Sequence, residues 1–383
     1  MDAYIFDAVR SPRAKARPDG GLAGCMPQEL VTALVDAMEV RGHSPREAGG
    51  LTLGCVGQLG DQGGHLGLVA KLHAGLAETA SALTINNYCV SGLSAVGIAA
   101  QRVAAGSAAQ LAGGVEMMSR VPFMGDRAAY YADTSLPRQL RYVPVVLAAD
   151  RLAQVKGVTR AELDAVALAS QQLAAAAPGR PGLFASLVEI AGCRADECIR
   201  PRTTAESLAD MAPGFAALAE QYAEALGAPV TALHTLGHAP PVCDGVALVL
   251  IGQQGEGMGK PRARILAHVD VGGDPELALL GGFTAMHRAL ALAGLELGDM
   301  DRVEFMESFA VTMALFQREA AIDPERVNVG GGHIARGHPM GASGAILLST
   351  LLDALDECGG RYGLVTCTGA GGVGAAMVIE RIA

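Results

Sequence analysis

The sequence of 383 residues predicts a layered α/β fold. Three observations lead to this prediction: strand patterns alternate with helix patterns, the apolar residues are mostly small, and the end of the chain resembles its beginning. Apolar residues make up 50% of the chain, which contains 50 glycines and no tryptophan. This composition favours close packing of helices on sheets over a bulky aromatic core.

Strand and helix patterns alternate through the first 118 residues. Strand patterns are short and aliphatic and end at turn residues, whereas helix patterns place apolar residues on one face. The strand patterns cover 3–12, 49–58, 82–88 and 108–118, and the helix patterns cover 27–42, 65–76 and 92–106. This order predicts helices packed on a sheet.

The chain divides into three parts. Residues 1–118 form a first half, residues 119–245 start irregularly and continue with helix patterns, and residues 246–383 return to strands and helices. A Ser-Gly dipeptide opens an apolar helix pattern after Cys89, and another opens one after His338, which predicts two similar halves. Because large excursions from a scaffold often carry binding sites, we expect the middle part to lie over the core and contribute to a substrate site.

Charge and composition exclude several classes of function. A net charge of −10 argues against a nucleic-acid partner, since phosphates are bound by Lys and Arg. The sequence has neither a signal-peptide core nor a run of about 18 apolar residues, so we expect a cytoplasmic protein that does not span a membrane. The eight cysteines form no CxxC pair, which favours reduced thiols over disulfides or a zinc site.

Cys89 follows a strand pattern and precedes a helix pattern. Free N–H groups and the positive end of the helix dipole favour a thiolate at such a position. We therefore expect the pKa of Cys89 to lie below that of a free cysteine. The local pattern alone is equally compatible with a small buried packing residue.

Two further reactive side chains occur at similar junctions. His338 lies between Gly337 and Pro339, and its imidazole can take a proton from a thiol or donate a hydrogen bond. Cys367 ends a strand and enters a glycine-rich turn whose N–H groups can point at a ligand oxygen. Taken singly, a turn histidine and a phosphate-binding turn remain alternatives, although this turn lacks the GK[ST] ending of a P-loop.

Together these residues and their surroundings resemble the thiolase family, which comprises acetyl-CoA acetyltransferases and 3-ketoacyl-CoA thiolases. The resemblance covers essentially the whole chain and rests on YIFDAVRSPRAK, NNYCVSGLSAV, AGGVEMMSRVPF, VNVGGGHIARGHPMGASGA and CTGAGGVGAAMVIE. It implies a five-layered α-β-α-β-α core of two similar halves, with an inserted loop domain that covers coenzyme A. The implied activity is acyl transfer between CoA thiols, by thiolysis of 3-ketoacyl-CoA or Claisen condensation of acyl-CoAs, as in fatty acid metabolism.

The resemblance implies a role for each reactive group. Cys89 would accept the acyl group, and His338 would activate it and help to form an oxyanion hole. Cys367 would abstract the α-proton of acetyl-CoA in condensation, or protonate the leaving enolate in cleavage. The backbone N–H groups of Cys89 and Gly369 would form the second oxyanion hole.

The resemblance also implies substrate contacts and an assembly. Arg200 matches an arginine near the CoA nucleotide, Phe215 an aromatic along pantetheine, and Phe309 an aromatic beside the acyl site. Coenzyme A enters as a substrate thioester, and the family requires no metal and no further cofactor. Its members are homodimers or homotetramers, so we expect a homo-oligomer.

The sequence departs from the family pattern around the substrate site. Met306 stands where family members carry the Asn or His that holds a water in the first oxyanion hole. His333, at a position that is usually small, is a candidate substitute, with a surface or packing histidine as the alternative. His238 and Pro240 replace a family Asn and Ser, and Val145-Val146 replaces a Met-Gly near the acyl pocket.

These departures leave more than one class of function open. A working thiolase is one, and a thiolase-like protein that binds acyl-CoA or supports a partner, with impaired carbon–carbon chemistry, is the other. The retained pair of cysteines favours the enzyme, because a scaffold has no need of it. A ketoacyl synthase acting with an acyl carrier protein is a third option, but such relatives use one Cys with two His, and Cys367 favours the CoA-dependent branch.

Overall fold

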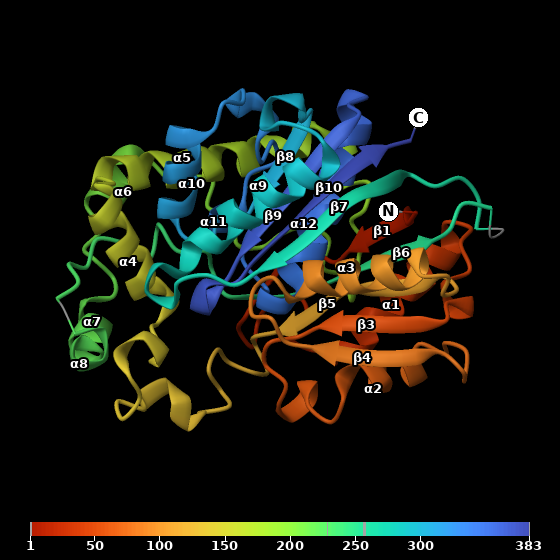
Figure 1. Cartoon of the computed structure of the whole chain (residues 1–383), viewed down its shortest axis with the longest axis horizontal. Helices are drawn as coiled ribbons and strands as arrows, with labels where there is room; N and C mark the ends of the chain where they lie inside the picture. The colour runs from red at the N-terminus through yellow and green to blue at the C-terminus, as the bar shows by residue number, and fades with distance from the viewer. Residues whose placement is uncertain (1, 228, 256–257, 383) are drawn as a thin grey trace.

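The computed structural model describes residues 2–227, 229–255 and 258–382 and has a mixed α/β fold (Figure 1). Its described strands form one ten-stranded sheet in the order β4-β3-β5-β6-β1-β7-β10-β9-β8, with β2 paired to β6. The strands are β1 (Tyr4–Arg10), β2 (Ala14–Lys15), β3 (Gly50–Gly54), β4 (Ser81–Ile85), β5 (Gln110–Met117), β6 (Cys243–Gly252), β7 (Ala263–Val271), β8 (Arg302–Phe305), β9 (Tyr362–Thr368) and β10 (Gly374–Arg381). The α-helices are α1 (Pro27–Val40), α2 (Leu66–His73), α3 (Ser91–Ala104), α4 (Val145–Lys156), α5 (Arg160–Ala176), α6 (Ala205–Ala209), α7 (Ala216–Gln221), α8 (Ala223–Leu226), α9 (Gly281–Ala293), α10 (Ala310–Glu319), α11 (His333–Arg336) and α12 (Ser343–Cys358).

The sheet consists of two halves. In the first half, β4, β3 and β5 run parallel, whereas β6 and β1 are antiparallel to their neighbours. In the second half, β7, β10 and β9 are antiparallel, and β8 runs parallel to β9. Two residue pairs, Tyr4 with Arg264 and Ile5 with Ala263, connect β1 to β7 and so join the halves.

Buried side chains divide the fold into layers. The helices α3 and α12 pack on each other and share one core cluster with strands of both halves. The helices α1 and α2 cover the other face of the first half, and α9 and α10 cover the other face of the second half. The resulting order of helix, sheet, helix, sheet and helix confirms the predicted five-layered core.

Local sequence explains the two central helices. Nearly all side chains of α12 are buried and most are apolar, as expected of a helix that lies between two layers of sheet. Small residues let α3 approach the segment before α12, since a Cβ on Gly92 would lie 2.7 Å from the Gly341 carbonyl oxygen. This close approach brings the two segments that begin after Cys89 and His338 together at one end of the core.

The inserted region lies beside the second half and includes α4 to α8 (yellow to green in Figure 1). Its longest helix, α5, packs against α10 and α11. The predicted start of the C-terminal half at residue 246 lies inside β6, and both neighbours of β6 in the sheet, β5 and β1, belong to the first half. The second half of the sheet therefore begins after β6. Among the described residues, no helix has the length and apolar character needed to cross a membrane.

Candidate active site

Cys89 lies in the turn between β4 and α3, directly before the N-cap residue Val90. Ser91 holds this turn, because its Oγ accepts a hydrogen bond from the Asn87 N–H at 2.8 Å and donates one to the Tyr88 carbonyl at 2.6 Å. Tyr88 has a φ of 48°, in the left-handed region that non-glycine residues rarely adopt. The strained turn leaves Cys89 9% exposed at the start of α3.

His338 is held on both the backbone and the ring. Its N–H donates to the Pro241 carbonyl at 2.9 Å, and Arg13 Nη1 donates to the Gly337 carbonyl at 3.1 Å. Gly337 has a φ of 97°, which requires glycine, and a Cβ there would lie 2.8 Å from Cys243 Sγ. Ring atom Nδ1 lies 2.7 Å from Ser343 Oγ, so Nε2 is the nitrogen left for chemistry.

Cys367 is fully buried near the end of β9, opposite Ala375 of β10. The chain then turns through Gly371 and Gly372, which have φ values of 69° and 86°. A Cβ on Gly369 would lie 3.3 Å from the backbone nitrogen of Cys89. The absence of side chains in this turn therefore allows it to contact the nucleophile turn directly.

The fold brings the predicted reactive residues together. Cys89, Cys367, Met306 and Met340 share one apolar core cluster that joins both halves. His338 lies two residues before Met340 in the chain, and its loop contacts the start of α3. These residues therefore lie where segments of the two halves meet.

The expectation of a lowered Cys89 pKa is wrong for this structure. Burial raises the pKa of Cys89 to about 12, and hydrogen bonds from the N–H groups of Ala370 and Cys89 itself oppose this only in part. The helix end and its N–H groups do not outweigh the loss of water around the sulfur. The free site thus holds a thiol, and a neighbouring base must remove its proton.

His338 has the protonation state that such a base needs. Burial, with a further contribution from Arg13, lowers the pKa of His338 to about 3, so its imidazole is neutral. Burial and the neighbouring Cys89 raise the pKa of Cys367 well above its ordinary value. Cys367 is therefore a protonated thiol, which is the form that can donate a proton to a carbanion.

The backbone donors differ in detail from the prediction. The Gly369 N–H donates to the Val373 carbonyl at 2.9 Å, and the Ala370 N–H bonds to the Cys89 sulfur. Gly369 therefore lies at the site, but its N–H is engaged inside the turn. Sequence reasoning missed Ala370, because the direction of each N–H depends on the φ and ψ values of the turn.

A buried ionic cluster supports the His338 loop. Asp196 accepts hydrogen bonds from Arg10 Nη1 at 2.9 Å and from the Arg13 N–H at 2.9 Å, and it pairs with Arg336. Burial alone would raise the pKa of Asp196, but Arg10, Arg336 and Arg13 hold it well below its ordinary value. The cluster fixes Arg13 against Gly337, and removal of one charge would leave the others unpaired in the interior.

Met306 and Glu307 have different surroundings. Met306 is fully buried, its N–H donates to the Thr366 carbonyl at 2.9 Å, and its thioether is only a weak hydrogen-bond acceptor. Glu307 accepts hydrogen bonds from Ser170 Oγ at 2.7 Å and the Ile334 N–H at 3.0 Å. Glu307 is thus an anchor between α5 and α11, and Met306 supplies no polar group for an oxyanion.

His333 lies beside His338. It is fully buried, neither ring nitrogen has a hydrogen-bond partner among the described residues, and the two ring centroids are 5.1 Å apart. Burial and Arg13 lower the pKa of His333 well below its ordinary value, so the ring is neutral. Its role as a substitute for the family Asn stays a prediction.

The predicted CoA contacts are spread over the inserted region and its border. Phe215 and Phe309 belong to one apolar cluster, with Phe309 8% exposed, whereas Arg200 is exposed on a loop after α5. His238, at the family Asn position, is bound to Asp164 at 2.6 Å, and burial lowers its pKa to about 4. His238 is therefore held as a neutral structural residue.

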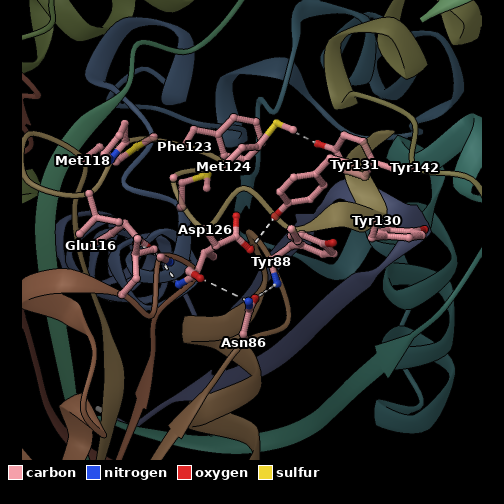
Figure 2. A pocket seen from close by; sticks show the side chains of 18 residues that line it. Asn86, Tyr88, Glu116, Met118, Phe123, Met124, Asp126, Tyr130, Tyr131 and Tyr142 are labelled. Atoms are coloured by element: carbon pink, nitrogen blue, oxygen red, sulfur yellow. Dashed lines mark hydrogen bonds between the residues drawn. The ribbon is translucent and has the colours of Figure 1, made fainter. Parts of the chain in front are cut away.

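An open cleft adjoins the nucleophile turn (Figure 2). Its volume is about 220 Å³, below the range of about 300–1,000 Å³ that is usual for small-molecule sites. Figure 2 shows Tyr88, Tyr130, Tyr131 and Tyr142 on one side and Met118 and Glu116 on the other. The sequence did not predict this cleft, because its walls come from five separate segments of the chain.

Comparison with known proteins agrees with this geometry. Residues 3–255 match the family profile described as "Thiolase, N-terminal domain", and residues 259–381 match "Thiolase, C-terminal domain". The division between the two profiles comes after β6.

Relatives match over most or all of the chain. A protein named beta-ketoadipyl-CoA thiolase from Escherichia coli is 34% identical over 420 residues and covers 100% of both chains. A 3-ketoacyl-CoA thiolase from Bacillus subtilis is 31% identical, covering 99% of both chains. An acetyl-CoA acetyltransferase from Escherichia coli K12 is 35% identical, covering 82% of both.

Proposed function

Since the chain belongs to the thiolase family, and is thus an acyltransferase that acts on acyl-CoA and CoA, we propose that it works through an acyl-enzyme on Cys89. The observations that carry this proposal are that Cys89 and Cys367 share one core cluster with Met340, and that the neutral His338 lies two residues before Met340 in the chain. The names of the three relatives differ in acyl group, so they leave the acyl chain open.

In the first half-reaction, His338 Nε2 takes the proton of Cys89, and the sulfur attacks the 3-keto carbon of a 3-ketoacyl-CoA. The bond between carbons 2 and 3 breaks, and its electron pair goes to the enolate of acetyl-CoA. Cys367 donates its proton to that enolate, and acetyl-CoA leaves. This division into an acyl-enzyme step and a carbanion step makes each easier than direct cleavage.

In the second half-reaction, the Cys367 thiolate takes the proton of the CoA thiol, and the CoA sulfur attacks the acyl carbon. The bond between that carbon and Cys89 breaks, acyl-CoA leaves, and His338 returns its proton to Cys89. The sum converts 3-ketoacyl-CoA and CoA into acyl-CoA and acetyl-CoA, and condensation is the same sequence reversed. The first half-reaction thus replaces a carbon–carbon bond by the thioester on Cys89, and the second exchanges one thioester for another. No metal or additional cofactor is needed for any of these steps.

Backbone N–H groups stabilise the negative charge that develops on the thioester oxygens. The Cys89 N–H and the Ala370 N–H are the donors nearest the sulfur, with Gly369 as the residue that lets the turn approach. Loss of one donor of this kind costs about 10²–10³ in rate. Because Met306 offers no donor, the other oxygen relies on His338 and on the neighbouring His333.

The remaining substrate contacts are also part of the proposal. Arg200 would bind the nucleotide of CoA, Phe215 would pack along pantetheine, and Phe309 would border the acyl site. A homodimer or homotetramer, a cytoplasmic location and a place in fatty acid metabolism stay predictions from the sequence.

Intact-protein mass spectrometry tests the acyl-enzyme. Wild type, Cys89→Ala and the control Cys358→Ala would each be mixed with acetyl-CoA and with acetoacetyl-CoA plus CoA, while acetyl-CoA release is followed. The exposed Cys358 is a matched thiol outside the site. We expect one acetyl adduct and turnover in wild type and Cys358→Ala, and neither in Cys89→Ala. Absence of an adduct from all proteins would instead favour an acyl-CoA-binding protein without acyl transfer.

A further inference from the structure

The cleft near Cys89 indicates which acyl chain the site accepts. We propose that it receives the chain of the 3-ketoacyl substrate and selects an uncharged chain, large enough to include an aromatic ring, over a chain that ends in a carboxylate. This inference rests on the proposed acyl-enzyme mechanism and adds the substrate class to it.

The cleft adjoins the turn that carries the reacting sulfur, although Cys89 itself is not a lining residue. Tyr88 is the residue before Cys89 and lines the cleft, as do Met118 and Met340, which share the apolar core cluster with Cys89. Burial raises the pKa of Tyr142, and Tyr88 and, to a smaller extent, Cys89 add to this effect. An acyl chain bonded to Cys89 therefore has this cleft next to it.

The walls suit an apolar or aromatic group. The ring centroids of Tyr131 and Tyr142 are 4.8 Å apart, and those of Tyr130 and Tyr142 are 6.0 Å apart in an edge-to-face arrangement. The Tyr142 hydroxyl also lies 3.6 Å from Met124 Sδ. Figure 2 shows these rings gathered around one side of the opening, where another ring would find edges and faces to stack on.

Exposed aromatic side chains at the mouth of the cleft also favour an apolar ligand. Phe123 is 40% exposed and Tyr130 is 43% exposed, both on the segment that forms the rim. When a ligand covers large apolar side chains that are exposed at the mouth of a cleft, the burial of their surface favours binding. An apolar chain in the cleft would remove part of both side chains from water.

The charges in the cleft oppose a terminal carboxylate. Among the 18 residues described as lining it, none is Lys, Arg or His, and two, Glu116 and Asp126, are acidic. Glu116 accepts hydrogen bonds from the N–H groups of Val56 at 2.8 Å and Gly57 at 2.9 Å. Asp126 accepts a hydrogen bond from the Tyr131 hydroxyl at 3.0 Å, so a carboxylate in the cleft would meet acidic groups and no cation.

Two neighbouring arginines are engaged outside the cleft, whereas the exposed Arg127, next to the lining residue Asp126, makes no side-chain hydrogen bond or ion pair with the described residues. Arg120 donates to Asp61 at 2.8 Å, and Arg141 donates to the carbonyl oxygen of Leu136 at 2.8 Å. Neither arginine is a lining residue. A dicarboxylic chain would therefore lose its hydration among the lining residues without gaining an ion pair from them.

A matched pair of substrates tests the inference. Thiolysis by the full-length protein would be measured with 3-oxohexanoyl-CoA and 3-oxoadipyl-CoA, which have six carbons each and differ at the chain end by methyl against carboxylate. 3-Oxo-5-phenylpentanoyl-CoA would test the ring, and acetoacetyl-CoA would serve as the activity check. Like-charge contacts that cost several kcal/mol correspond to about 100-fold or more, so we expect kcat/KM for 3-oxohexanoyl-CoA to exceed that for 3-oxoadipyl-CoA by this factor. The phenyl substrate should lie within about tenfold of 3-oxohexanoyl-CoA.

Variants of the cleft test its location. Asp126→Lys places a cation where the chain would end and should raise kcat/KM for 3-oxoadipyl-CoA by about tenfold or more, with Asp126→Asn intermediate. Asp133→Asn is the control for Asp126→Asn: it makes the same charge change on the same exposed segment but outside the cleft. It should leave the order of kcat/KM among the substrates unchanged.

The outcomes separate the two proposals. If acetoacetyl-CoA is cleaved but 3-oxoadipyl-CoA equals or exceeds 3-oxohexanoyl-CoA, the substrate inference is wrong and the acyl-enzyme mechanism stands. The substrate inference is also wrong if kcat/KM for the phenyl substrate falls more than about 100-fold below that for 3-oxohexanoyl-CoA. It is wrong as well if Asp133→Asn changes the substrate preference as much as Asp126→Asn does. If none of the four substrates is cleaved, both proposals fall.

Discussion

Ser343 offers a direct test of how His338 is held. Its Oγ lies 2.7 Å from His338 Nδ1, and both side chains are buried. For Nε2 to accept the proton of Cys89, Nδ1 must carry the ring proton and donate it to Ser343 Oγ. Ser343→Ala removes this acceptor, leaves the buried Nδ1–H without a partner and frees the ring to rotate.

The expected magnitude follows from that single hydrogen bond. A buried polar group that loses its partner costs about 1–3 kcal/mol, and if this cost appears in the transition state, kcat falls by about 10- to 100-fold. KM should change by less than about threefold, because Ser343 does not contact CoA in the proposed site. The assay is steady-state thiolysis of acetoacetyl-CoA, with the rate of acyl-enzyme formation measured separately.

Ser349→Ala is the matched control. Ser349 lies on the same helix, α12, is fully buried, and donates to the Ala345 carbonyl at 3.1 Å, so its removal costs a similar hydrogen bond without touching histidine. Both variants should lose thermal stability, and only Ser343→Ala should lose kcat. Equal kcat values in the two variants would refute the assignment of Ser343 as a positioning residue for His338.

Three further predictions follow from the buried groups of the site and its surroundings. Since burial raises the pKa of Cys89 to about 12, the rate of its alkylation by iodoacetamide, read at the Cys89 peptide, should still be rising at about pH 9, and a plateau near neutral pH would contradict this. Cys367→Ala should keep the acetyl adduct on Cys89 but slow carbon–carbon cleavage by about 10²–10⁴, so full turnover would remove the proton-donor role from Cys367. Burial raises the folded-state pKa of Glu304 to about 8, above its ordinary 4.5, so its contribution to stability is present at low pH and is lost as pH rises through about 8. The drop in Tm between about pH 6 and about pH 9 should therefore be smaller in Glu304→Gln than in wild type, and equal drops would show that Glu304 titrates normally.

Much of the fold followed from local patterns. The strand before Cys89, the helix after it and the Ser-Gly helix after His338 lie where the sequence indicated, because apolar periodicity and turn residues act over a few positions. The placement of β6 was harder, since its strand pattern is equally compatible with either half. Hydrogen bonding to β5 and β1 decided it, and those partners are more than 100 residues away in the chain.

The sequence by itself determined which reactive side chains this protein carries and predicted that they form one site, because Cys89, His338 and Cys367 each occur at a strand or turn junction in one of two similar halves. Only the tertiary structure decided their protonation and their donors. Burial outweighs the helix end at Cys89, the turn aims the Ala370 N–H at the sulfur, and Ser343 holds the ring of His338. The acyl cleft is likewise a tertiary feature, because desolvation, N–H direction and cavity shape depend on segments that are distant in the chain and become neighbours only on folding.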